Sequence, residues 1–120
     1  MRWGLFIILL IASPVFAKQG TITLLAVSEE SPVLEGDIAT LYLETRPGTG
    51  HVFLETFPLS KADTQISMRF AKQVACSKLP INCDTYDFIF TLRANSAVIS
   101  GPSAGAAAAV LTYAVLSDLP

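Results

Sequence analysis

Four stretches of the chain alternate apolar with polar residues or are rich in β-branched and aromatic residues, and both features are typical of strands. They lie at residues 21–27, 38–44, 51–56 and 86–92. A turn-rich segment, Arg46-Pro47-Gly48-Thr49-Gly50, separates the second stretch from the third. We therefore predict that residues 38–56 form a β-hairpin and that residues 28–36 and 93–100 are loops.

The segment after the third stretch has the spacing of a helix. Ser60 is expected to begin it, with Asp63 three residues later as an acidic capping-box partner. Apolar side chains then recur at helical intervals, which predicts a buried stripe of Ile66, Phe70, Val74, Ala71 and Ala75. The basic residues of this helix are expected to face solvent; they are Lys61, Arg69, Lys72 and Lys78.

A second helix is predicted at residues 104–116, where alanines, Gly105 and larger apolar residues leave almost no large polar group. Small residues allow close packing, so we expect a buried core helix, and the run is too short to cross a membrane by itself. The order strand, strand, strand, helix, strand, helix predicts a single α+β domain over residues 18–120.

Residues 1–17 have the composition of an export signal. Arg2 supplies a positive start, residues 5–12 are apolar, and Val15-Phe16-Ala17 ends the segment with a small-residue cleavage pattern. An uncleaved anchor, with residues 3–16 attaching the chain to a membrane, is the alternative. Both interpretations place the rest of the chain outside the cytoplasm, either secreted or tethered to the membrane.

The charge content argues against one class of partner. Charged residues make up 15% of the chain, hydrophobic residues make up 52%, and the formal net charge is −2. No basic face is interleaved with aromatic residues, so we do not expect the chain to bind nucleic acid. Gly48-Thr49-Gly50 lacks a third glycine and a following Lys-Ser/Thr pair, so we do not interpret it as a phosphate-binding loop.

The two cysteines, Cys76 and Cys83, enclose a short segment that contains Pro80, a residue that ends helices. In an oxidising compartment a disulfide between them would close a small loop and stabilise the fold by about 2.5 kcal/mol. Two buried free thiols are the alternative. With His51 as the single histidine, the cysteines form no zinc-ligand pattern, and we expect no metal site.

The segment Gly101-Pro102-Ser103-Ala104-Gly105 places one serine at the start of the second helix. Glycine permits a tight turn there, and proline has its φ angle already set for a first helical position. The serine would lie where unpaired amide groups and the positive end of the helix dipole meet, which favours a developing oxyanion. The simpler interpretation is that Ser103 only caps the helix.

Together these features resemble the proteolytic domain of Lon proteases, a family of Ser–Lys peptidases. The matching parts are the strand at 21–27, the region 41–56 with its Pro-Gly-Thr-Gly turn, the helix at 63–78 and the segment 101–105. The similarity spans residues 19–118 and covers the nucleophile-bearing part of the family's domain, which would be incomplete at its C-terminus. The leader indicates a small exported or membrane-attached, archaeal-like relative without an ATPase module.

The resemblance implies a serine endopeptidase with Ser103 as its nucleophile and with an oxyanion-binding turn at Gly101, Pro102 and Ala104. The base in this family is a lysine on a later helix, which we expect beyond Pro120. A serine hydroxyl without an adjacent base is a poor nucleophile, so the chain by itself is expected to be inactive or nearly so.

This chain departs from the family's pattern at three positions. Many members carry an acidic residue three positions before the nucleophile, where this chain has Ser100. Some members carry histidines in the preceding strand, where this chain has Ile89 and Thr91. These departures concern substrate binding and the orientation of the serine and its base.

The resemblance makes a peptide or protein the substrate and implies no metal or organic cofactor. Substrate backbone would add as a strand to an exposed edge at residues 51–56. Members of the family commonly form rings, which implies a homo-oligomer. Within this chain, His51 and the lysines of the first helix are expected to be solvated instead of acting as the base. The alternative function is a non-catalytic exported binding or scaffolding domain with the same fold.

Overall fold

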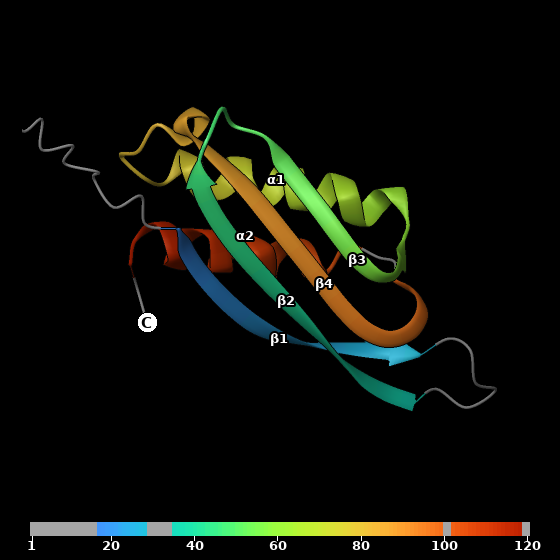
Figure 1. Ribbon diagram of the computed structural model, residues 1–120. Helices are drawn as coiled ribbons and strands as arrows, with labels where there is room; N and C mark the ends of the chain where they lie inside the picture. The colour runs from blue at the N-terminus through green and yellow to red at the C-terminus, as the bar shows by residue number, and fades with distance from the viewer. Residues whose placement is uncertain (1–16, 29–34, 100–101, 119–120) are drawn as a thin grey trace, which may run out of the picture.

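Two helices lie against one face of a four-stranded sheet, and the other face carries no helix in the residues that the structure describes (Figure 1). The computed structural model describes residues 17–28, 35–99 and 102–118. The predicted α+β class is confirmed. In chain order the elements are β1 (Lys18–Ser28), β2 (Glu35–Pro47), β3 (Val52–Ser60), α1 (Ala62–Ser77), the short 3-10 helix η1 (Cys83–Thr85), β4 (Tyr86–Ile99) and α2 (Ala104–Leu116).

The strands occur in the order β1-β2-β4-β3, with β2 antiparallel to both of its neighbours and β3 parallel to β4. The predicted hairpin over residues 38–56 is therefore wrong, because β4 lies between β2 and β3. The amide of Gly48 donates to the carbonyl of Thr85 (2.9 Å), and the amide of Gly50 donates to the carbonyl of Tyr86 (3.0 Å). These bonds attach the turn to the beginning of β4 instead of closing β2 onto β3.

Helix α1 begins later than the capping pattern predicts. Ser60 is the last residue of β3, where it pairs with Ile99 of β4, so it is not the N-cap. Lys61 holds that position without a side-chain capping bond, and Asp63 Oδ1 accepts a hydrogen bond from the amide of Thr64 (2.8 Å). The capping prediction is wrong because the backbone of Ser60 pairs with β4 in the sheet.

The buried face of α1 also differs from the prediction. Ile66, Phe70 and Val74 are 53%, 59% and 53% exposed, so most of the predicted apolar stripe faces outward. Ala71 and Ala75 are buried as expected. Helical periodicity fits two neighbouring stripes equally well, and smaller side chains let α1 approach its neighbours closely. The residues that α1 buries are Thr64, Met68, Ala71 and Ala75.

Helix α2 has the predicted bounds, but only one of its sides is buried. Val110 is 64% exposed and Tyr113 is 39% exposed, so the expectation of a fully buried core helix is wrong for this side. Gly20 of β1 fits beneath the helix, because a Cβ atom at that position would lie 2.5 Å from Cγ2 of Val115. The side chains that α2 buries are Ala108, Leu111, Thr112, Val115 and Leu116.

Strand β4 is longer than predicted, since the residues expected to form a loop at 93–100 continue the strand to Ile99. Arg93 pairs with Thr40 of β2 on one side and with Phe57 of β3 on the other. Past an irregularity near the end of β3, the two parallel strands pair again. Strands β2 and β3 together therefore hold the start of this segment at Arg93, and among the described strands β3 alone holds its end at Val98 and Ile99.

The core lies between the sheet and the two helices. Burial of each large apolar side chain contributes about 1.5–3 kcal/mol, so this layer accounts for much of the stability. Its fully buried large apolar residues are Leu41, Leu43, Met68, Phe88, Phe90 and Leu92. The opposite face of the sheet instead exposes large apolar side chains, namely Leu25, Val27, Ile38, Tyr42, Phe53, Phe57 and Leu59.

A disulfide joins Cys76 near the end of α1 to Cys83 in η1, with 2.03 Å between the Sγ atoms and 6.1 Å between the Cα atoms. Of the two states considered for these cysteines, the structure contains the bridge. Helix α1 ends at Ser77, ahead of Pro80. The disulfide therefore ties the C-terminal end of α1 to the segment that leads into β4.

The leader or anchor predicted at residues 1–17 lies outside the described residues, apart from Ala17. Two residues of the serine-bearing turn, Ser100 and Gly101, also lie outside them. Within the described ranges, no helix has both the length and the apolar content needed to cross a bilayer.

Candidate active site

Ser103 directly precedes α2, at the N-terminus of the helix. Its backbone is helical (φ −61°, ψ −30°), its side chain is exposed, and its hydroxyl makes no capping hydrogen bond. The amide of Gly105 closes the turn by donating to the carbonyl of Pro102 (2.9 Å). Ser103 thus holds the capping position without capping, so the simpler interpretation does not account for its hydroxyl.

The start of α2 is the place where the sequence predicts oxyanion donors. The first amides of a helix have no acceptor within the helix, and they lie at the positive end of its dipole. Pro102 has no amide hydrogen, and the amide of Gly105 is engaged, whereas Gly101 lies outside the described residues. Within the described part of the turn, the amides of Ser103 and Ala104 are therefore the candidates for these oxyanion donors.

Ser103 lies at the end of the molecule where β3 and β4 end and α1 begins. Strand β4 reaches Ile99 opposite Ser60 of β3, and α2 starts a few residues later. The two helices approach each other closely here, because a Cβ atom on Gly105 would lie 3.2 Å from the Cβ atom of Ser67 in α1. The serine therefore lies near the first turns of α1.

Of the three lysines that flank the helices or contact their ends, two lie far from Ser103 and one lies near it. Lys18 contacts the last carbonyl of α2 (3.5 Å) and the carboxylate of Asp118 (3.1 Å), at the far end of a helix about 20 Å long. Lys78 follows the C-terminal end of α1, whereas Lys61 precedes its first turn, at the end of the molecule near the serine. In the described part of the chain, no lysine hydrogen-bonds the Ser103 hydroxyl.

His51 lies at the opposite end of the sheet from Ser103. It precedes β3, whose nine residues extend about 30 Å to Ser60. Its Nδ1 atom is 2.8 Å from Oγ1 of Thr49 and 3.5 Å from Oδ1 of Asp87, and its side chain is 65% exposed. The geometry therefore separates the single histidine from the candidate nucleophile.

Asp87 organises the turn between β2 and β3. Its Oδ1 atom accepts hydrogen bonds from the amides of His51 and Thr49, each at 3.0 Å. These two bonds lower the pKa of Asp87, because they favour the charged carboxylate. Lys72, which was expected to face solvent, is half-buried and donates to the carbonyl of Gly50 (2.7 Å). The turn amides are thus bound within the protein, and a phosphate would find none of them open.

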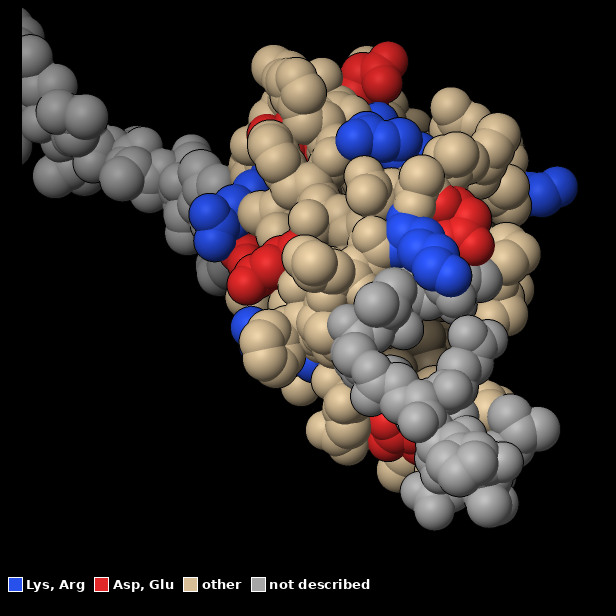
Figure 2. Space-filling view, turned by 90° about the vertical axis from the view of Figure 1, so that its right-hand side faces the viewer, with Lys and Arg blue, Asp and Glu red and all other residues tan. Residues whose placement is uncertain are grey.

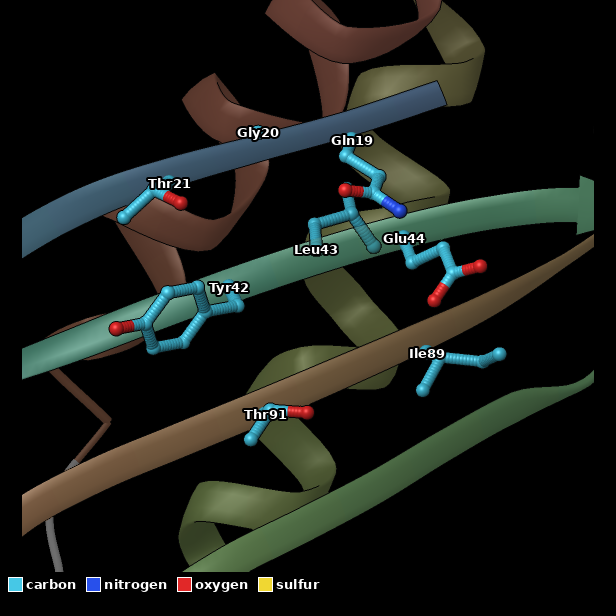
Figure 3. A pocket seen from close by; sticks show the side chains of 8 residues that line it. All are labelled: Gln19, Gly20, Thr21, Tyr42, Leu43, Glu44, Ile89 and Thr91. Atoms are coloured by element: carbon cyan, nitrogen blue, oxygen red, sulfur yellow. The ribbon is translucent and has the colours of Figure 1, made fainter. Parts of the chain in front are cut away.

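A small cavity of about 150 Å³ lies on the sheet face that the helices leave open (Figure 3). Thr21, Tyr42 and Thr91 form a row across three strands there. The sheet separates this cavity from α2, so it is not part of the Ser103 site. Sequence alternation could place these residues on one face but could not show which face the helices cover. The cavity is lined by Gln19, Gly20, Thr21, Tyr42, Leu43, Glu44, Ile89 and Thr91.

Charged side chains are scattered over the surface seen in Figure 2, with positive and negative groups mixed. Among the described residues, no group of three or more His, Cys, Asp or Glu side chains is placed to hold a metal ion.

No protein-family model and no curated protein sequence matches this chain. The Lon resemblance therefore rests on the motifs and on the order of elements alone.

Proposed function

We propose that this chain is the nucleophile-bearing part of a Lon-type serine endopeptidase and that Ser103 is its nucleophile. The observation that carries the proposal is the Ser103 hydroxyl, which is exposed at a helix N-terminus and makes no capping bond. A serine whose role is capping would use its hydroxyl to accept a hydrogen bond from an amide of the first turn.

The reaction is acyl transfer to the serine and then to water. Ser103 Oγ attacks the peptide carbonyl carbon while the base takes its proton, and the amides of Ser103 and Ala104 hold the oxyanion. The base returns the proton to the leaving amine as the C–N bond breaks, and water then hydrolyses the acyl ester. The base is a lysine downstream of Pro120, as the resemblance implies.

The open edge of β3 supports a binding mode for the substrate backbone. The carbonyl of His51 accepts a hydrogen bond from the amide of Phe88 (2.8 Å), so every second residue from His51 onward faces β4. A peptide added at the other side would run toward Ser60, the end of β3 nearest Ser103. The residues whose amide and carbonyl groups face this open edge are Val52, Leu54 and Thr56.

Covalent trapping tests the proposal. A chain extended past Pro120 to include the expected lysine is incubated with a peptide boronate, which forms a tetrahedral adduct with a nucleophilic serine. Mass spectrometry should locate the adduct on Ser103, and Ser103→Ala should remove it. Ser77→Ala is the control, because Ser77 is an exposed serine at the far end of α1 whose hydroxyl donates to the carbonyl of Val74 (2.7 Å). An adduct on another residue would refute the assignment.

A non-catalytic exported binding domain is the second candidate function. Two observations favour it: in the described residues no ionisable group hydrogen-bonds the Ser103 hydroxyl, and the open face of the sheet exposes apolar side chains. This function predicts that the extended chain forms no boronate adduct and cleaves no peptide.

A further inference from the structure

The two edges of the sheet are protected to different degrees. At the β3 edge, Pro58 lacks an amide hydrogen and the register shifts between Phe57 and Leu59. Strand β1 forms the other edge with eleven residues, none of them proline, and Lys18 is its only charged residue. A long edge strand of this kind offers its amide and carbonyl groups to another strand.

Strand β1 also carries the most exposed large apolar side chain among the described residues. Leu25 is 93% exposed, Val27 is 59% exposed, and Ile38, which pairs with Leu25 from β2, is 57% exposed. A second strand beside β1 would cover apolar surface on both faces of the sheet, which favours association. On the helix side, the residues of β1 that are only partly buried are Ile22, Leu24 and Ala26.

We propose that β1 pairs antiparallel with β1 of a second copy of this chain, so that one sheet runs through both copies. Pairing the whole strand places Thr23 opposite the partner's Thr23 on the two-fold axis and Thr21 opposite the partner's Leu25. Outward-facing residues then meet outward-facing residues, and helix-side residues meet helix-side residues, as a continuous sheet requires. The interface is isologous, and it does not depend on the proposed peptidase function.

The charges at the two ends of the β1–β2 ribbon fit an antiparallel partner. Lys18 begins β1, whereas the other end of the β1–β2 ribbon carries Asp37, which pairs with Ala26. Antiparallel pairing brings the partner's Lys18 to the end that carries Asp37, whereas parallel pairing would bring the two lysines together. The Lys18 side chain is 32% exposed where it contacts Asp118, so it is accessible to a partner.

A charge placed on the axis tests the proposal. The full chain, produced with its N-terminal segment in an exporting host, should have twice the mass of one chain by light scattering. Thr23→Lys sets two lysines face to face and should lower that mass twofold. Thr91→Lys is the matched control, because it makes the same change on the same face of β4, opposite Glu55, and should stay dimeric. A monomeric wild type, a dimeric Thr23→Lys protein, or dissociation by Phe57→Lys at the β3 edge would overturn the proposal.

A cysteine on the axis gives a second test that does not depend on loss of structure. Cys76 and Cys83 are bonded to each other, so a cysteine at position 23 would be the sole free thiol. Directly opposed residues of antiparallel strands have Cβ atoms about 4.5–5.5 Å apart, close to disulfide range. Thr23→Cys should form a covalent dimer on mild oxidation, whereas Thr91→Cys should remain a monomer on a non-reducing gel. Equal cross-linking of the two variants, or none with Thr23→Cys, would overturn the pairing.

Discussion

Two segments of this chain combine glycine, proline and a hydroxyl residue, and they differ in what their polar groups bind. In the turn at residues 47–50, the amides of both glycines donate to backbone carbonyls and the amide of Thr49 donates to Asp87. At residues 102–105, the amide of Gly105 is bonded within the turn, but the Ser103 hydroxyl caps nothing. We call the turn at residues 47–50 the satisfied turn, because all of its amides are hydrogen-bonded within the protein. A turn of this kind stabilises the fold, whereas a turn with an unbonded polar group can bind a ligand or react.

Removing the hydroxyl of Ser103 or of Thr49 should show the largest difference between the two segments. In a chain extended past Pro120, Ser103→Ala should lower the rate of peptide cleavage by about 10³-fold or more. Its free energy of unfolding should change by less than about 0.5 kcal/mol, because the hydroxyl makes no capping bond. Thr49→Ala, which removes the contact to His51 Nδ1, should keep most of the activity. Initial cleavage rates and urea unfolding measure both quantities.

The opposite pattern would identify a cap. A loss of about 1 kcal/mol in Ser103→Ala, without any cleavage activity to lose, would assign the serine to capping. Robust cleavage by residues 18–120 alone would show that the base lies within this chain. Lys61, at the end of the molecule near the serine, would then be the first residue to substitute.

Breaking the disulfide should weaken the end of the molecule that holds the satisfied turn. Replacing Cys76 and Cys83 together by serine should lower the free energy of unfolding by about 2.5 kcal/mol, since the bridge limits the unfolded chain. Urea unfolding of the wild type with and without a reductant checks this value, and the reduced protein should match the double variant. Thiols that react with an alkylating agent before reduction would contradict the bridge.

A methyl group placed in the satisfied turn should have the next largest effect. Gly48→Ala would direct its Cβ atom into the carboxylate of Asp87, which holds two turn amides. We expect a loss of about 1–3 kcal/mol in the free energy of unfolding. Gly36→Ala is the control, because no atom beyond its two chain neighbours lies within 4 Å of its added Cβ, and it should change stability by less than about 0.5 kcal/mol. Equal losses would show that the carboxylate moves aside.

Acid should loosen the satisfied turn by the smallest amount. The pKa of Asp87 is lowered by bonds from the amides of His51 and Thr49. Its contribution to stability is therefore present above the pKa of an unfolded aspartate, about 3.9, and is lost as the pH falls through the folded value. Below about pH 4, the melting temperature of the wild type should fall more steeply than that of Asp87→Asn. Asp84→Asn in η1 should follow the wild type, and identical slopes for all three proteins would contradict the role of Asp87.

Features of the fold that depend on neighbouring residues could be predicted from the sequence. The bounds of α2 follow from an unbroken run of small and apolar residues after a glycine-proline turn. The segment between Cys76 and Cys83 was short enough to suggest a bridge. The position of Ser103 before the helix was predicted by the same local logic, although the sequence could not show that its hydroxyl makes no capping bond.

Features that depend on distant residues could not be predicted in this way. The signals in Pro47-Gly48-Thr49-Gly50 are those of a hairpin, and nothing local shows that Asp87 binds the turn while β4 separates its two strands. Likewise, the spacing of Ile66 and Phe70 fits a buried face, but packing selects the stripe that contains Met68. Tertiary contacts therefore decide between local structures that fit the sequence pattern equally well.

The central place of β4 sets the order in which this protein can fold during synthesis. Strands β1 and β2 are consecutive and antiparallel, so they can pair as soon as both have emerged. Among the described strands, β3 has β4 as its only neighbour in the sheet, so it cannot pair until β4 has been made. Pairing of segments far apart in sequence is also slow. Most of the chain can therefore pass through a narrow translocation channel before its sheet is complete, which suits a protein whose N-terminus is predicted to direct export.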